Sequence, residues 1–419
     1  MTPRAEGPAL PPDVERELES APPCEIAIGV LTYNNAETVP AVTEVVRAGL
    51  ERHFPGVPAV LINADAGSED GTPNRLTAAG LPLVRVRHAT PLDERLAMPF
   101  HGVPGRGAAL RLTFAVARRL GARGLVLLEA DVTSAADEWL ERLLRPVLEQ
   151  KADLVVPVYA RHRYDGTLTN LVLAPLVRAL FGRRLHQPLA GAGALSARLL
   201  DRLLADPRWP ASGTNQTDLW VEGTAIADGF AVWEAWLGPR HAASRARTAD
   251  LPTLVAQAVG GLFALMGGYD DLWLDIRTSE PVPAAGAPVP SSAEPVALDV
   301  DRMVGAFRRG LRDLSTIWEH VLAPETLGDV LSLDASSATR LRFPDEVWAR
   351  VVYDFALGHH YAVVYREHLL RSFVPLYLGR TAAFVVATRD GLVGAAEAHL
   401  DHVGETFELS KPYLVERWQ

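Results

Sequence analysis

The sequence predicts an α/β fold over roughly its first two thirds and a mostly α-helical part after it. Short apolar runs, typical of buried strands, alternate there with stretches of helical spacing. Each run ends in polar or glycine residues, as a strand that leads into a loop does. From about residue 296 onward the pattern is largely helical. Alternating strands and helices indicate a parallel sheet with right-handed crossovers.

The composition is that of an ordinary globular protein, with 48% hydrophobic and 22% charged residues among 419. A formal net charge of −10 gives no support to nucleic-acid or anionic-membrane binding as the main task. The single cysteine, Cys24, excludes an internal disulfide and a cysteine-based zinc site. The first residues lack the pattern of a secretory signal, and the most apolar window, 251–266, is too short to span a bilayer. We expect a cytoplasmic protein.

The elements follow from these runs in chain order. Residues 1–23, rich in Pro, Glu and Ala, are expected to form a flexible lead-in with one short helix. The expected strands cover 24–31, 59–63, 83–87, 124–128, 153–159 and 231–237. The helices expected between and after them cover 39–50, 74–79, 108–120, a stretch from about 135, stretches that end at 181 and about 204, a stretch from Thr217, and 251–266.

The C-terminal part begins after a segment of different composition. Residues 279–295 are mainly Pro, Ala and Ser, which is typical of a linker. Helices are then expected over 300–322, 324–331, 343–360 and 361–378, the last with Pro375 inside it. The chain is therefore divided into a lead-in at 1–23, a domain at 24–278, the linker, and a helical domain at 296–419.

Two carboxylates close the apolar run that starts at Gly124. Glu129 and Asp131 are two residues apart, so on a strand they point the same way. A cation is the simplest relief for their repulsion, and α/β proteins bind ligands at the carboxyl edge of a parallel sheet. Asp131 could instead cap the helix that begins near Ala135. From this stretch alone, a helix cap and a metal site are equally supported.

Other loops add weaker signals of the same kind. Asp65 with Ser68 suits contacts to a base or ribose, and Arg106 between two glycines at a helix start suits phosphate. Such residues are more often ordinary turn formers. Asp218 and Glu222 are four residues apart and share one face of a helix. A phosphate loop and a dinucleotide fingerprint are both absent from the sequence, which argues against an ATPase and a nicotinamide dehydrogenase.

Eight loop motifs, taken in order, resemble those of the retaining GT-A glycosyltransferases that make glucosylglycerate or glucosyl-3-phosphoglycerate, and of the related mannosylglycerate synthases. The motifs lie at 33–39, 65–72, 105–107, 129–131, 166–169, 187–191, 221–222 and 241. The resemblance covers roughly residues 24–275. It implies a GT-A fold that transfers a hexose, glucose or mannose, from UDP-glucose or a GDP-sugar to D-glycerate or 3-phosphoglycerate, with retention.

The resemblance also implies roles for single residues. The donor would be bound by Leu31, Tyr33, Asn35, Asp65, Ser68, Arg106, Glu129, Ala130 and Gly191. A divalent cation, Mg²⁺ or Mn²⁺, would be bound by Asp131 and His241. Asp131 and Arg106 would stabilise the leaving diphosphate. Asp218 and Glu222 are suited to bind sugar hydroxyls, and packing or a solvated helix charge is an equally supported interpretation of this pair. The acceptor would be bound by Arg163, Gly166, Thr167 and Thr169.

The chain departs from the family pattern at several of these positions. Arg106 stands in place of a lysine, and Glu129-Ala130-Asp131 in place of Asp-x-Asp. Ala192 replaces a glutamate, and Thr167 replaces the arginine of the acceptor loop. The last change favours glycerate over 3-phosphoglycerate unless Arg161 or Arg163 takes over the phosphate.

Alternatives remain at this level. A non-catalytic sugar-nucleotide binding protein is one rival. A nucleotidyltransferase is a more distant one, because its glycine-rich first loop is absent at 32–38. The helical domain is expected either to cap the site or to form a homodimer face.

Overall fold

The computed structural model describes residues 10–76, 80–88, 90, 101–191, 193–209, 217–241, 250–289, 298–337, 339–391 and 393–418. The chain forms two compact units. The sheet unit comprises Met1–Ala160, Leu189–Ala249 and Val282–Ser292, and the helical unit comprises Arg161–Pro188, Asp250–Pro281 and Ala293–Gln419. Each unit is thus built from three stretches, whereas the sequence analysis divides the chain once, at 279–295. Parts of the predicted lead-in, of the helix over 74–79 and of the linker lie outside the described residues.

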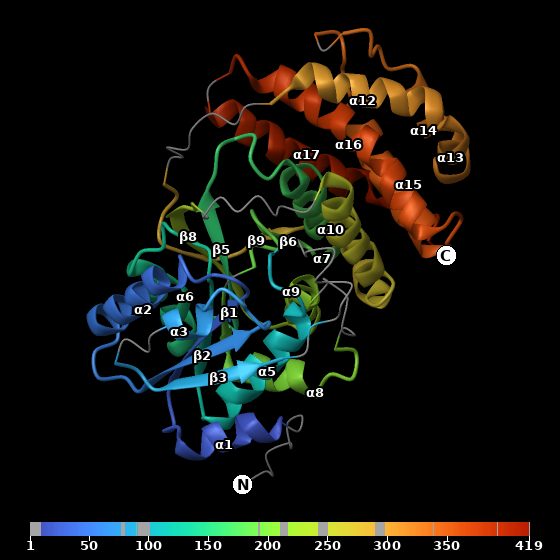
Figure 1. Ribbon diagram of the computed structural model, residues 1–419. Helices are drawn as coiled ribbons and strands as arrows, with labels where there is room; N and C mark the ends of the chain where they lie inside the picture. Colours follow the sequence, from blue (N-terminus) through green and yellow to red (C-terminus); the bar gives the residue numbers. More distant parts are fainter. Residues whose placement is uncertain are drawn as a thin grey trace. The chain divides into compact units, whose positions relative to one another are not determined.

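The predicted α/β architecture with a largely helical C-terminal part is confirmed (Figure 1). The main sheet has the strand order β10-β8-β5-β7-β4-β1-β2-β3. Its strands are β1 (Ile26–Thr32), β2 (Ala59–Asp65), β3 (Leu83–Arg87), β4 (Gly124–Glu129), β5 (Leu154–Ala160), β7 (Gly193–Ser196), β8 (Val232–Pro239) and β10 (Ala284–Ala285).

The predicted parallel pairing of β1, β2, β3 and β4 is confirmed, and the one antiparallel strand of the main sheet among the described residues is a strand that was not predicted. β7 runs antiparallel to both β4 and β5, while the other pairs are parallel. The sequence analysis did not predict β7, and it did not predict β10, which pairs with β8 inside the expected linker. All residues of β1 and β2 are buried, which matches their continuous apolar runs.

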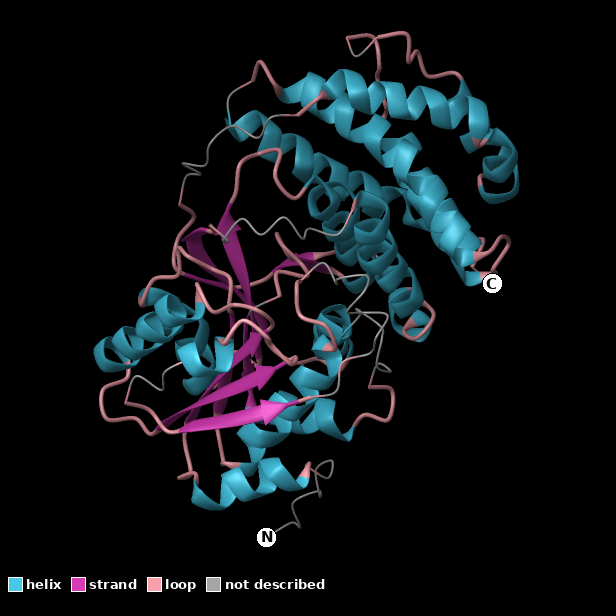
Figure 2. Cartoon of the chain, in the orientation of Figure 1, coloured by secondary structure: helices cyan, strands magenta, loops and turns pink. Residues whose placement is uncertain are grey.

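Helices cover both faces of this sheet (Figure 2). The helices of the sheet unit are α1 (Pro12–Ser20), α2 (Val39–His53), α3 (Thr72–Arg75), α5 (Arg106–Arg119), α6 (Glu138–Leu148), α8 (Ala197–Ala205) and α9 (Thr217–Ala227). α2 packs on α6, and α5 packs on α8. α6 begins at Glu138, so Asp131 does not cap it and the capping alternative is wrong.

The helical unit contains one small sheet and most of the long helices. β6 (Arg183–Arg184) pairs with β9 (Glu280–Pro281). The helices are η1 (Thr169–Leu173, a π-helix), α7 (Ala174–Phe181), α10 (Leu251–Met266), α11 (Asp270–Trp273), α12 (Val300–Asp313), α13 (Ser315–Val321), α14 (Pro324–Leu331), α15 (Asp345–His360), α16 (Arg366–Thr388) and α17 (Val393–Val415).

Three expectations for this unit need correction. The single helix over 300–322 is two helices, α12 and α13, and the helix over 361–378 starts at Arg366 and runs to Thr388. α17 was not predicted. Pro375 does lie inside α16, where it packs against Gly310 of α12; a Cβ at Gly310 would lie 2.6 Å from the Cβ of Pro375. The lack of a side chain at Gly310 therefore lets the two helices pack closely.

α16 is long and apolar enough to cross a membrane by length and composition alone. Within the structure, 78% of its most apolar window is buried. It also carries Arg380, a buried guanidinium that pairs with Asp345 of α15. We therefore interpret α16 as a core helix of the helical unit.

Candidate functional site

The predicted donor loops lie next to one another because their strands are neighbours. β1 is hydrogen-bonded to β2 on one side and to β4 on the other, and all three run parallel. Thr32 is in register with Asp65, and Leu31 is in register with Glu129. The polar residues that follow these strands therefore gather at one edge of the sheet, which is where α/β folds bind ligands.

Asp65, at the end of β2, accepts four hydrogen bonds from the protein. Its Oδ1 accepts from the hydroxyls of Thr32 (2.8 Å) and Ser68 (2.6 Å). Its Oδ2 accepts from the backbone N–H groups of Gly67 (2.9 Å) and Ser68 (2.8 Å). A carboxylate offers about four acceptor positions. Asp65 therefore fixes the loop that follows β2, and its predicted contact with a donor nucleotide stays a prediction.

The loop after β1 is tied to the same place. The Ser68 hydroxyl accepts a hydrogen bond from the backbone N–H of Asn34 (2.8 Å), which has a left-handed φ of 55°. The Asn35 side chain accepts from the backbone N–H of Tyr33 (2.8 Å). Asn35 is buried and Tyr33 is half-buried. These bonds preorganise the turn that the sequence analysis assigns to the base of the donor.

Leu31 and Ala130 are both buried, at 3% exposure each. The carbonyl of Ala130 accepts a hydrogen bond from the Thr38 hydroxyl (2.6 Å). This bond joins the turn after β1 to the end of β4. The predicted contacts of Leu31 and Ala130 with a donor stay predictions.

Arg106 is the centre of a buried charge cluster. It is the first residue of α5, directly after Gly105, whose left-handed φ of 68° turns the chain into the helix. The Nε and Nη2 atoms donate to the two oxygens of Asp218 at 2.8 and 3.0 Å. Nη2 also donates to Glu129 (3.0 Å) and to the carbonyl of Gly191. One guanidinium thus joins α5, the end of β4, the turn at Gly191 and the start of α9.

The cluster shifts the pKa of two of its members. Burial alone would lower the pKa of Arg106, but the carboxylates of Asp218 and Glu129 raise it above its usual value. Burial raises the pKa of Glu129, and the neighbouring Asp131 raises it further, while Arg106 opposes the rise. Arg106 therefore stays charged and holds the two carboxylates together.

Two glycines make room for this arrangement. Gly191 has a φ of 83°, and a Cβ there would lie 2.7 Å from Oε1 of Glu129. A Cβ on Gly107 would lie 2.7 Å from the hydroxyl oxygen of Thr217, at the start of α9. Side chains at either position would push α9 or Glu129 away from Arg106.

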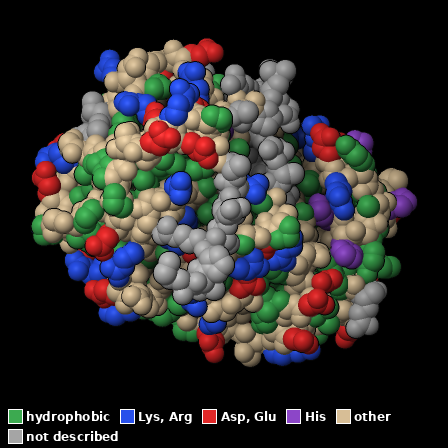
Figure 3. All heavy atoms as spheres, turned by 90° about the horizontal axis from the view of Figure 1, so that it is seen from below, with side chains coloured by type: hydrophobic (Ala, Val, Ile, Leu, Met, Phe, Trp, Pro, Cys, Tyr) green, Lys and Arg blue, Asp and Glu red, His purple; other side chains and the backbone are tan. Residues whose placement is uncertain are grey.

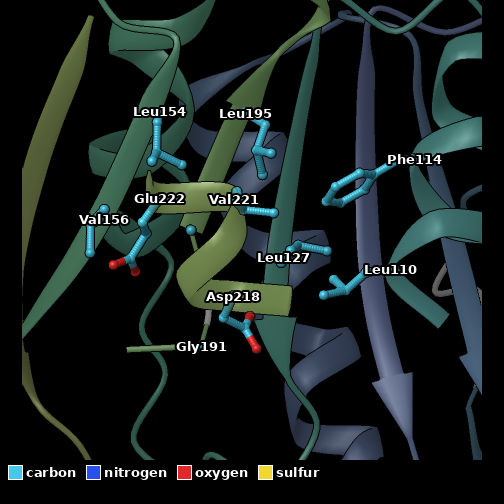
Figure 4. A pocket seen from close by; sticks show the side chains of 11 residues that line it. Leu110, Phe114, Leu127, Leu154, Val156, Gly191, Leu195, Asp218, Val221 and Glu222 are labelled. Carbon is cyan, nitrogen blue, oxygen red and sulfur yellow. The ribbon is translucent and has the colours of Figure 1, made fainter. Parts of the chain in front are cut away.

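Asp218 and Glu222 lie one turn apart on α9 and line a small cavity of about 30 Å³ together with Gly191 (Figure 4). The rest of its lining is mainly apolar and includes Phe114 and Leu127. Glu222 accepts the backbone N–H of Leu189 at 3.0 and 3.3 Å. Burial, reinforced by the charge of Asp218, raises the pKa of Glu222 to about 8. Glu222 is therefore mostly protonated at neutral pH and can donate a hydrogen bond into the cavity.

The predicted metal residues share one corner of the sheet unit. The backbone carbonyl of His241 accepts a hydrogen bond from the N–H of Thr133 (2.8 Å), and the backbone N–H of His241 donates to the Ser134 hydroxyl (2.8 Å). His241 is therefore bound to the loop that follows Asp131. The Asp131 side chain is 39% exposed. Among the described residues no group of three or more His, Cys, Asp or Glu is placed to hold a metal ion.

Asp131 has a cationic neighbour that the sequence analysis missed. Nη2 of Arg240 lies 3.7 Å from Oδ1 of Asp131. Arg240 comes directly after β8, beside His241, and the only sequence signal for it is a basic residue at a strand's carboxyl end. Thr32, Thr38 and Asn34 were also missed, because their partners are 33 to 92 residues away in the chain.

The predicted acceptor residues belong to the helical unit. Arg163 donates to three carbonyls at the C-terminal end of α16: Thr388 (3.2 Å), Arg389 (3.1 Å) and Gly391 (2.9 Å). The Thr167 hydroxyl is 2.6 Å from that of Tyr377, also on α16. Gly166 has a φ of 68°, and Thr169 begins the π-helix η1. Irregular turns of this kind are frequent at functional sites.

The surface carries a mixture of side-chain types. Acidic, basic and hydrophobic side chains are interspersed over the face drawn in Figure 3. This mixture agrees with the composition of 41 Lys and Arg against 51 Asp and Glu. Ala192, the position where the family glutamate is missing, lies outside the described residues.

Comparisons with known proteins give matches among solved structures alone. No protein-family model matches the chain, and no curated protein matches it. Structures of glucosyl-3-phosphoglycerate synthase from Mycobacterium tuberculosis are similar to it. The complex with Mn²⁺, UDP and glucosyl-3-phosphoglycerate is 24% identical, with a TM-score of 0.43, over 61% of this chain and 82% of that one. The complex with phosphoglyceric acid is also 24% identical, with a TM-score of 0.43, over 63% and 85%. The strand order and site geometry described above are observed in this chain itself and do not depend on that similarity.

Proposed function

We propose that this protein is a metal-dependent GT-A glycosyltransferase that moves a hexose from a nucleoside diphosphate sugar to D-glycerate, with retention. The observation that carries the proposal is the cluster of Arg106, Glu129, Asp218 and Gly191 at the carboxyl edge of β4. The sheet unit thus contains this charged cluster, the accessible carboxylate of Asp131 and a small cavity with a mainly apolar lining.

The charge balance of this corner supports a divalent cation. Glu129, Asp131 and Asp218 carry three formal negative charges, and Arg106 and Arg240 carry two positive ones. The net negative charge would repel a diphosphate, so an added cation is needed before such a ligand can bind. The accessible carboxylate of Asp131 and the imidazole of neighbouring His241 are suitable ligands for Mn²⁺ or Mg²⁺.

When bound, such a cation stabilises the charge that develops on the leaving diphosphate. The remaining tasks fall to the chain. Arg106 holds Glu129 and Asp218 in place. The protonated carboxyl of Glu222 donates a hydrogen bond to a sugar hydroxyl, and Asp218 accepts one. The turns after β1 and β2 bind the nucleoside.

The choice of glycerate rests on the acceptor loop. A phosphate group is usually held by arginine or by several N–H groups. Thr167 cannot make an arginine's bidentate contact, and the guanidinium of Arg163 already donates to three carbonyls at and just beyond the C-terminal end of α16. The carboxylate and hydroxyls of glycerate need only the backbone of 166–169 and the Thr169 hydroxyl. The same fold acting on 3-phosphoglycerate is the alternative.

A screen of donors and acceptors tests the proposal. The protein is incubated with MnCl₂, with UDP-glucose, GDP-glucose or GDP-mannose, and with D-glycerate or 3-phosphoglycerate. We expect one donor to give a glycoside of glycerate, detected by mass spectrometry, with the donor's anomeric configuration retained by NMR. A higher kcat/KM for 3-phosphoglycerate would refute the acceptor argument. Failure of every donor to release nucleoside diphosphate would refute the enzymatic proposal and leave at most a sugar-nucleotide binding protein.

A further inference from the structure

Arg240 is held loosely for a partly buried arginine. Its Nη2 atom is 3.7 Å from Oδ1 of Asp131, which is beyond hydrogen-bond distance. The guanidinium carbon lies 5.6 Å from the ring centre of Tyr159. Its Nε atom is buried and has no hydrogen-bond partner. A buried donor without a partner is costly, and a catalytic role or a bound water or ion is among the reasons for which native proteins keep one.

The contrast with Arg106 decides which guanidinium is available to a ligand. Nε and Nη2 of Arg106 make four contacts with Asp218, Glu129 and Gly191, and its side chain is 3% exposed. The Arg240 side chain is 29% exposed, and its buried Nε has no hydrogen-bond partner. Arg106 is therefore an organiser of the site, while Arg240 can move without breaking a hydrogen-bonded network.

We propose that Arg240 binds the diphosphate of the donor once a divalent cation has taken its place beside Asp131. The cation and Arg240 compete for the same carboxylate. When the cation is bound, the planar fork of the guanidinium is released to contact phosphate oxygens with two N–H groups. This inference rests on the proposed function, because it takes a nucleoside diphosphate as the ligand.

The test is calorimetric and does not depend on turnover. UDP and UMP are titrated into wild-type protein and into Arg240→Gln at saturating Mn²⁺, and GDP and GMP are used in the same way. We expect Arg240→Gln to weaken diphosphate binding about 10- to 100-fold and monophosphate binding less, so that the preference for the diphosphate shrinks. Arg240→Lys should fall between, since it keeps the charge and loses the fork.

A second titration follows the competition directly. Mn²⁺ is titrated without nucleotide and the free ion is measured by electron paramagnetic resonance. Removal of the competing guanidinium in Arg240→Gln should raise the affinity for Mn²⁺, an effect that loss of packing would not give. Arg142→Gln is the matched control, because Arg142 donates to the carbonyl of Trp236 on the same strand, β8. It should change neither titration.

The outcomes separate the two proposals. If the wild-type protein binds neither UDP nor GDP with Mn²⁺, both proposals are overturned. If it binds one of them and Arg240→Gln binds it equally well, only the role of Arg240 is overturned. Equal weakening of diphosphate and monophosphate, with unchanged Mn²⁺ affinity and a lower melting temperature, would assign Arg240 a purely structural role.

Discussion

Arg106 uses the planar shape of its guanidinium to join several partners. Its planar fork donates to both oxygens of Asp218 while the same Nη2 atom reaches Glu129 and the Gly191 carbonyl. An ammonium group has three donors on one atom and cannot span these partners with the same geometry. A lysine at this position would carry the same charge but could not make these four contacts together.

Asp131 is expected to matter for chemistry and not for folding. It is 39% exposed and has one loose ion pair, so Asp131→Ala should change the free energy of unfolding by less than about 0.5 kcal/mol. Loss of its carboxylate should lower kcat by about 100-fold or more, because the cation would lose its main protein ligand. Turnover assays at several Mn²⁺ concentrations measure this. Near-normal turnover would contradict the metal assignment.

His241→Ala gives a milder version of the same test. The histidine backbone is held by Thr133 and Ser134, and these bonds survive the substitution. We expect the Mn²⁺ affinity to fall while the affinity for nucleotide at saturating Mn²⁺ changes little. An unchanged Mn²⁺ titration would make His241 a surface residue.

Glu222 gives a prediction about pH. Its pKa rises from 4.5 in the unfolded chain to about 8 in the folded one. Between these values the folded state keeps a proton that the unfolded state has lost, so this contribution to stability is complete below pH 4.5 and disappears as the pH rises through 8. In Glu222→Gln the free energy of unfolding should no longer fall over this pH range, a fall that amounts to about 1.4 kcal/mol per pKa unit in the wild-type protein. Thermal unfolding of both proteins from pH 5 to 9 measures this difference. If the melting temperatures of the two proteins depend on pH in the same way, the pKa of Glu222 is not shifted.

At the scale of single residues, the sequence identifies candidate site residues but not the residues with which they form hydrogen bonds. It marks Arg106, Glu129, Asp218 and Glu222, and the structure brings them together. It does not reveal that Arg106 pairs with Asp218, 112 residues away, because no local spacing encodes a tertiary contact. The assignment of Arg163 to the acceptor stays a prediction, and the contacts of its guanidinium with the end of α16 were not predicted.

At the scale of elements, α16 supports the loop that precedes η1. Tyr164 packs edge-on against Phe384, Arg163 binds the carbonyls at the end of α16, and the Thr167 and Tyr377 hydroxyls are 2.6 Å apart. The C-terminal helices thus fix the backbone of the predicted acceptor loop.

Tyr377→Phe tests this support. It removes one buried hydroxyl and the bond to Thr167, worth about 1 kcal/mol. We expect the KM for glycerate to rise about fivefold, while the KM for the donor stays the same. Tyr353→Phe is the control, since Tyr353 is also buried and its hydroxyl donates to the Phe407 carbonyl at 2.6 Å. If both variants change donor and acceptor alike, the effect is one of stability.

Elements with long apolar runs were predictable, and short or unusual ones were not. β1, β2, β3 and β5 lie within about two residues of their predicted ends. β7 was not predicted because its four residues, Gly193–Ser196, do not alternate between apolar and polar side chains. They also follow a stretch that was interpreted as a ligand-binding motif. The break between α12 and α13 was not predicted because the helical spacing of apolar residues continues across Leu314.

At the scale of the whole molecule, the two units depend on interleaved segments. α7 packs on α17, and α10 packs on α15 and α16, although these partners are far apart in the sequence. A chain that ends at residue 292 should therefore expose the apolar faces of α7 and α10 and aggregate. Soluble yield and size-exclusion chromatography measure this, and co-expression of 293–419 should restore solubility. A soluble, monodisperse 1–292 fragment would show that the first segments do not need the later helices.

The same interleaving has a consequence for synthesis on the ribosome. The chain passes between the units at Ala160, Pro188, Ala249, Pro281 and Ser292. α7 and α10 leave the exit tunnel long before α16 and α17, which cover them, have been translated. Nascent chains of intermediate length thus carry exposed apolar helices, the kind of surface that chaperones bind. The helical unit can reach its native packing only after α16 and α17 have been translated, so the yield of the protein in a cell should depend on elongation rate and chaperone supply.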